Sequence, residues 1–82
     1  MITVGEILKK ELSIRKISQK NFAEKFNMKN SHFSELLSNK RTLSVRKALE
    51  LEKLLGILAE FWLNIQNKTK IDYEKENRRL YK

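Results

Sequence analysis

The chain has 82 residues, a length that allows one domain with a modest hydrophobic core. It has no cysteine, which excludes disulfides and cysteine-ligated metals, and its lack of proline with only two glycines favours helices over a β-sandwich. The formal net charge of +8 at pH 7 is typical of proteins that bind polyanions, although a basic surface that only keeps a protein soluble has the same composition.

The first two predicted helices each begin after a capping residue. Thr3 caps a helix from Val4 to Lys16, and Glu6 completes a capping box with it. Ser18 caps a second helix from Gln19 to Phe26. The apolar residues that recur at helical spacing and should face one core are Ile7, Leu8, Leu12, Phe22, Ala23 and Phe26.

A third predicted helix follows a turn at Asn27, a residue type that tolerates the left-handed conformation that ends helices. The helix runs from about Asn30 to Ser38, with a polar outer face. Residues 38–42 are expected to form a loop in which Asn39 is the left-handed residue. The buried residues of this helix should be Phe33, Leu36 and Leu37.

A fourth predicted helix runs from Val45 to Leu55, capped by Ser44 and ended by Gly56. Its apolar positions cover more than one side, so burial on more than one side, including a dimer contact, is expected. The predicted inner face consists of Val45, Ala48, Leu49, Glu52 and Leu55, widened by Leu51 and Leu54.

A fifth predicted helix spans Ala59 to Gln66, with Phe61, Trp62 and Ile65 facing inward in a core or dimer contact. The chain then divides into a helical domain over residues 1–67 and a charged tail over residues 68–82. The tail can form a separate helix from about Ile71 to Leu80. The predicted fold class is therefore all-α, a five-helix bundle with a possible extra C-terminal helix.

Basic residues are concentrated in two segments. Residues 29–47 carry five basic side chains and one acidic, and residues 68–82 carry six basic and three acidic. The first segment coincides with the third helix and the loop after it. The second and third helices, joined by a short turn, are also the pattern of a helix-turn-helix, whose second helix reads bases in the major groove.

Two known families resemble this chain. Ser18 to Met28 resembles the first half of the helix-turn-helix of phage repressors and Cro, the XRE type. Over about residues 3–67 the chain resembles the HigA/VapI family of addiction-module antidote proteins, on the segments Thr3–Leu8, Ser31–Leu37, Asn39–Arg41, Ala48–Leu49 and Glu60–Gln66. The family usually has glycine at Asn27 and Asn39, and a polar cap where this chain has Ile57 and Leu58.

The resemblance implies a lambda repressor-like DNA-binding domain and assigns roles to particular residues. Gln19, at the start of the second helix, would hold a DNA phosphate, and Lys40 and Arg41 would lie along the DNA backbone. Lys29 is also predicted to contact DNA. It stands where the family has a serine or threonine cap, so Asn30 can become the cap and shift the reading residues. The residues that would face the bases are Asn30, Ser31, Ser34 and Glu35.

Elementary chemistry agrees with these roles. Asparagine can pair with adenine through two hydrogen bonds, and glutamate can accept from cytosine. Lysine and arginine attract phosphates whatever the sequence. The alternatives are that the third helix presents an ordinary solvated face and that Lys40 and Arg41 belong to an ordinary polar loop. His32, the single histidine, cannot build a metal site or a catalytic triad alone.

Other function classes have little support in the sequence. A cysteine nucleophile, a second histidine and a Gly-rich phosphate loop are missing, so no enzyme, cofactor or metal site is predicted. The longest apolar run, Leu54 to Ala59, is far shorter than the ~20 residues of a membrane span. A cytoplasmic location is expected. The basic groups do not line one long helix face, which disfavours a membrane-surface binder.

The predicted function is sequence-specific binding of double-stranded operator DNA by a transcriptional regulator. It is expected to act as a homodimer that recognises an inverted repeat and represses its own operon. The resemblance adds the role of an antitoxin that neutralises a HigB-like mRNA endonuclease toxin. Two alternatives stay open: a protein-interaction module for toxin capture with weak DNA binding, and the DNA-binding head of a longer phage or metallopeptidase-linked regulator.

Overall fold

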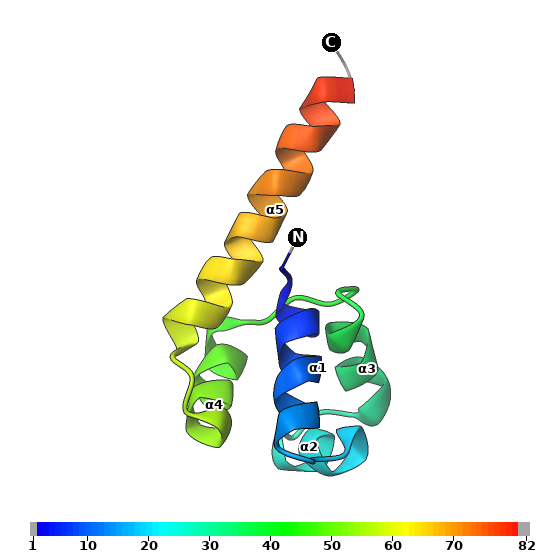
Figure 1. The fold of residues 1–82 in the computed structure, drawn as a ribbon, viewed down its shortest axis with the longest axis vertical. Helices are drawn as coiled ribbons and strands as arrows, with labels where there is room; N and C mark the ends of the chain where they lie inside the picture. Colours follow the sequence, from blue (N-terminus) through cyan, green and yellow to red (C-terminus); the bar gives the residue numbers. More distant parts are fainter. Residues whose placement is uncertain (1, 81–82) are drawn as a thin grey trace.

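The computed structural model describes residues 2–80, with side chains up to residue 77. Five helices and no strand occur in this part of the chain, which confirms the all-α prediction (Figure 1). The helices are α1 (Val4–Ile14), α2 (Gln19–Lys25), α3 (Asn30–Leu37), α4 (Val45–Leu55) and α5 (Ala59–Leu80). None of the helices described is long and apolar enough to span a membrane.

Local capping sets where these helices begin and end. The Thr3 hydroxyl accepts a hydrogen bond from the Glu6 amide at 3.2 Å, and the hydroxyls of Ser18 and Ser44 each accept an amide hydrogen bond at 3.1 Å. These are the three predicted caps. Lys16 has a φ of 56°, which explains why α1 stops short of its predicted end. Residues with positive φ follow four helices: Lys16, Asn27, Asn39 and Gly56.

Helix α5 differs most from the sequence prediction. It is one continuous helix of 22 residues, where a helix ending at Gln66 and a separate tail helix were expected. No glycine or proline follows Gly56, so nothing in the local sequence interrupts it. The carboxylate of Glu52 accepts the Ala59 amide at 2.8 Å and replaces the polar cap that the family has before this helix. The division of the chain after residue 67 falls within α5 and stays a prediction.

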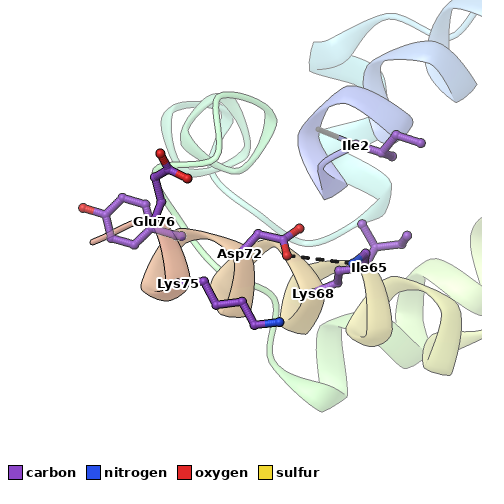
Figure 2. Close-up of a pocket in the computed structure, with 7 residues that line it drawn as sticks. Ile2, Ile65, Lys68, Asp72, Lys75 and Glu76 are labelled. Carbon is purple, nitrogen blue, oxygen red and sulfur yellow. Dashed lines mark ion pairs between the residues drawn. The ribbon is translucent and has the colours of Figure 1, made fainter. Parts of the chain in front are cut away.

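The outer half of α5 projects beyond the other four helices (Figure 1), and the chain measures 46 × 23 × 22 Å along its principal axes. The N-terminal segment runs beside the middle of α5, where the Thr69 hydroxyl donates to the Ile2 carbonyl oxygen at 3.3 Å. An open groove of about 580 Å³ lies between Ile2 and α5 (Figure 2). Lys68 lines this groove and forms an ion pair with Asp72 at 3.8 Å.

The hydrophobic core lies where the five helices meet. Three phenylalanines, Phe22, Phe26 and Phe33, join α2 to α3 with ring centroids 5.4 to 6.0 Å apart. Burial of these large side chains is the main source of stability in a domain of this size. The other buried side chains are Val4, Leu8, Leu12, Ala23, Leu36, Leu37, Leu43, Ala48, Leu51, Leu55, Ala59 and Trp62.

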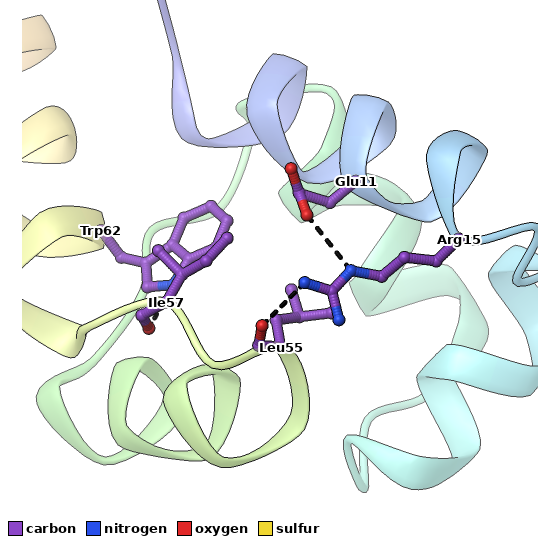
Figure 3. Close-up of polar contacts among 5 residues, drawn as sticks. All are labelled: Glu11, Arg15, Leu55, Ile57 and Trp62. Carbon is purple, nitrogen blue, oxygen red and sulfur yellow. Dashed lines mark hydrogen bonds and ion pairs between the residues drawn. The ribbon is translucent and has the colours of Figure 1, made fainter.

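One polar contact connects the end of α1 to the end of α4, and a second holds α5 to the segment between α4 and α5 (Figure 3). Arg15, just after α1, donates to the Leu55 carbonyl oxygen at 2.7 Å and pairs with Glu11 at 3.2 Å. The last carbonyls of α4 lack partners within the helix, and Arg15 supplies one. Trp62 is fully buried, and its indole N–H donates to the Ile57 carbonyl oxygen at 3.2 Å.

Three residues predicted to face the core are exposed instead. Val45 and Leu49 on α4 are 63% and 48% exposed, and Phe61 on α5 is 42% exposed. The stripe that α4 buries is Ala48, Leu51 and Leu55. As a prediction of the core of a single chain, the sequence prediction was wrong for Val45, Leu49 and Phe61, because helical periodicity does not say which of several apolar stripes is buried. The dimer contact that the sequence also allows for α4 and α5 stays a prediction.

Candidate nucleic-acid interface

The α2–turn–α3 unit has the backbone of a helix-turn-helix. Asn27 takes the predicted left-handed conformation with a φ of 50°, and the Met28 amide donates back to the Ala23 carbonyl oxygen at 3.0 Å. The small, buried Ala23 allows the two helices to approach closely. This turn and the phenylalanine cluster hold α3 against α2 with its polar side outward.

The start of α3 shows which residue occupies the N-cap position, Lys29 or Asn30. Lys29 is the N-cap residue by backbone geometry and makes no side-chain cap hydrogen bond. Asn30 is the first residue inside the helix, so it does not take over as the cap. Asn30 therefore stands in the first turn of α3, and the predicted register of the reading face is unchanged.

The predicted site residues all lie at the surface of the molecule. Asn30, Ser31 and Ser34 are exposed on α3, and Glu35 beside them is partly exposed. Helical spacing places these four positions on one side of α3. The remaining predicted residues are all exposed, at the start of α2, before α3 and in the loop after it: Gln19, Lys29, Lys40 and Arg41.

An ion pair connects two of these residues that the sequence assigned to different tasks. Arg41, in the loop, contacts the Glu35 carboxylate at 3.2 Å, and both side chains are nearly half exposed. The chain reverses between them at Asn39, whose φ is 63°. Sequence reasoning missed this pair because a contact between a helix residue and a loop residue six positions later depends on the path of the loop.

Asn39 also fixes the loop to α1. Its side-chain oxygen accepts the Gly5 amide at 3.1 Å, and its side-chain nitrogen donates to the Thr3 hydroxyl at 2.9 Å. A Cβ atom at Gly5 would overlap the carbonyl oxygen of Leu37, so α1 and the end of α3 touch through backbone at this point. Asparagine therefore supplies both the left-handed conformation and two contacts that glycine could not make.

Gln66 fixes the other end of the loop to α5. Its side-chain oxygen accepts the Leu43 amide at 2.7 Å, and its side-chain nitrogen donates to the Leu43 carbonyl oxygen at 2.9 Å. Residues 38–44 are thus held by α1 at one end and by α5 at the other. Sequence reasoning treated Gln66 only as the end of a helix. The one indication of its importance in the sequence is its place at the end of Glu60–Gln66, a segment that resembles the HigA/VapI family.

Lys47 ties α4 to the helix-turn-helix. Its ammonium group donates to the Phe26 carbonyl oxygen at 2.6 Å, lies 4.6 Å from the centre of the Phe26 ring, and pairs with Glu50 at 2.9 Å. These contacts occupy Lys47 within the fold, whereas Lys40 and Arg41 in the loop are exposed to solvent. No group of three or more histidine, aspartate or glutamate side chains within the described residues could hold a metal ion.

Comparisons with known proteins find helix-turn-helix regulators and antidote proteins. No family model matches the chain. It is 32% identical over 63 residues, 77% of this chain and 67% of the relative, to YddM, an HTH-type transcriptional regulator of Escherichia coli strain K12. A Nostoc punctiforme structure, assigned to the antidote proteins of plasmid maintenance systems, has 30% identity and a TM-score of 0.91 over 98% of this chain and 88% of that one. A HigA-family addiction-module antidote protein of Coxiella burnetii has 30% identity and a TM-score of 0.78 over 98% of this chain and 90% of that one.

These relatives are named as regulators and antidotes, and none as an enzyme. They share with this chain the whole five-helix arrangement and not only the helix-turn-helix, since the two structural matches cover nearly all of it. The chain belongs to the phage-repressor (XRE) family of helix-turn-helix proteins, together with the HigA/VapI-type addiction-module antidote proteins.

Proposed function

We propose that the chain is a DNA-binding repressor of its own operon and a HigA-like antitoxin that neutralises a HigB-like mRNA endonuclease toxin. The observation that carries the DNA-binding part is the exposed polar face of α3, which continues into the loop of Lys40 and Arg41. Short hydrogen-bonding side chains suit base edges, and the adjacent cations suit phosphates. The antitoxin role rests on the family alone. Repression of an operon would place the protein in the cytoplasm.

The experiment separates base reading from phosphate binding. Asn30→Ala should relax discrimination at one base position, at about 1–3 kcal/mol for a lost bidentate contact. Lys40→Ala should weaken binding to all duplexes about equally and lower the slope of log affinity against log salt by about one. Both variants and the parent are titrated with the promoter fragment of the chain's own gene and with a scrambled duplex of equal length.

Circular dichroism of each variant controls for folding, and both side chains are exposed, so neither change should affect it. If Lys40→Ala changes the sequence preference and Asn30→Ala does not, the assignment of α3 as the reading helix is wrong. If the parent binds neither duplex at low salt, the DNA-binding proposal fails. The alternative of a toxin-capture module would then take its place.

A further inference from the structure

A second groove, of about 280 Å³, lies between the 38–44 loop and the middle of α5. Arg41 and Thr42 line it from the loop, and Thr69, Lys70 and Tyr73 line it from α5. The groove is open to solvent and directly adjoins one of the predicted phosphate-binding residues, Arg41. No role for α5 in binding a ligand follows from the sequence or from the family resemblance.

The face that α5 presents to this groove is fixed by direct contacts. Gln66 is the first residue of α5 that lines the groove, and both polar atoms of its side chain bind the backbone of Leu43. Thr69 is held from the other side by its contact with the Ile2 carbonyl oxygen. Because Lys70 and Tyr73 follow Gln66 by four and seven positions, helical spacing puts them on the same side of α5 as Gln66.

The charges at the groove favour an anion. Arg41 and Lys70 contribute cations from its two walls. Arg41 is held by the exposed, weak ion pair with Glu35, for which a phosphate can compete, and Lys70 makes no ion pair with any described carboxylate. Lys68, only two positions earlier, is paired with Asp72 and does not line this groove; it lines the neighbouring groove beside Ile2, which shares only Tyr73 with this one (Figure 2). The two lysines thus have the same formal charge on the same helix but different surroundings.

We infer that this groove receives a phosphate of the DNA backbone and that Lys70 is a phosphate-binding residue contributed by α5. The inference rests on the proposed DNA-binding function and extends its contact surface from α3 and the loop to α5. A duplex is favoured over a free phosphate ion because the groove is open along one side and continues the exposed cations of the loop. A phosphate of the DNA backbone could therefore approach both Arg41 and Lys70 without entering an enclosed cavity.

The test uses salt dependence, because each phosphate contact adds about 0.9 to the slope of log affinity against log salt. A duplex of arbitrary sequence suffices, since phosphate contacts carry no sequence information. Lys70→Ala should lower the slope by about one, and Lys70→Arg should restore it. The matched control is Lys68→Ala, which removes the same charge two residues away and should leave the slope close to that of the parent.

Arg41→Ala serves as the reference for the proposed function and should also lower the slope by about one. Equal slopes for Lys70→Ala and Lys68→Ala, with a lowered slope for Arg41→Ala, would overturn the role of α5 and leave the DNA-binding proposal standing. A parent protein that binds no duplex at low salt would overturn both. Circular dichroism checks that all four variants fold, which is expected because the three side chains are exposed and because alanine and arginine are good helix formers at positions 68 and 70.

Discussion

The ion pair between Glu35 and Arg41 joins a residue predicted to contact bases to a residue predicted to contact a phosphate. Glu35 stands on the predicted base-reading face, and Arg41 is predicted to bind a phosphate, yet in the free protein they hold each other at 3.2 Å. Exposed pairs of this kind contribute only about 0–1 kcal/mol, so a phosphate can compete for Arg41. While the pair is closed, the carboxylate reduces the attraction of Arg41 for any duplex.

Replacing Glu35 by glutamine should therefore strengthen binding to non-specific DNA. The gain should reach up to about fivefold at low salt, which corresponds to ~1 kcal/mol. Because this gain does not depend on sequence, it should be equal for the promoter fragment and a scrambled duplex, and the preference for the promoter should fall only by what the Glu35 carboxylate contributes to base reading. Affinities of parent and Glu35→Gln for both duplexes measure this. In an Arg41→Ala background most of the gain should vanish; the same gain in both backgrounds would mean that the pair has no special role.

At the scale of whole helices, the sequence predicted what depends on neighbours in the chain. The caps at Thr3, Ser18 and Ser44 and the left-handed Asn27 and Asn39 are local features, and they place α1 to α4 almost correctly. The helix-turn-helix, and with it the exposure of the predicted site residues, followed from the same local signals.

What the sequence could not give is what depends on distant partners. Gln66 contacts Leu43, Asn39 contacts Gly5, and Arg15 contacts Leu55, all more than twenty residues apart in the chain. The exposure of Phe61 has the same origin, because helical periodicity cannot tell which of two adjacent aromatic residues will meet α4. The full length of α5 was not predicted because the sequence after Gln66 is highly charged. It nevertheless contains no glycine or proline that would break the helix.

The neighbours Phe61 and Trp62 give a direct test of the packing of α5. Trp62→Ala removes a fully buried ring and should cost about 3–5 kcal/mol of unfolding free energy. Phe61→Ala removes a ring that is 42% exposed and contacts Trp62 edge-on, with centroids 5.8 Å apart, and should cost less than about 1.5 kcal/mol. Urea denaturation followed by circular dichroism measures both. Equal losses would contradict the observed register of the helix.

At the scale of the whole molecule, the homodimer predicted from the sequence would set the form of the operator. One α3 helix reads only a few base pairs, so a two-fold dimer should recognise an inverted repeat with half-sites about 34 Å apart, one turn of DNA. Sedimentation over a range of protein concentrations, with and without the promoter fragment, tests the assembly. Inserting about five base pairs between the half-sites should weaken binding, since it turns one half-site to the opposite side of the duplex. A strict monomer in both conditions would contradict the proposal.

The outer half of α5, which projects beyond the other helices, can open without disturbing the core. Local unfolding costs least where few buried contacts are broken, and up to residue 77 the last fully buried side chain of α5 is Trp62. Backbone amides should therefore exchange with deuterium at graded rates along one helix: slowest near Trp62, intermediate around the contacts of Gln66 and Thr69, and fastest beyond Tyr73. A ligand that binds the outer turns of α5, DNA included, would slow the exchange of these amides, and the slowing would increase with the affinity of the ligand. Amide exchange thus makes the projecting end of α5 a built-in reporter of occupancy.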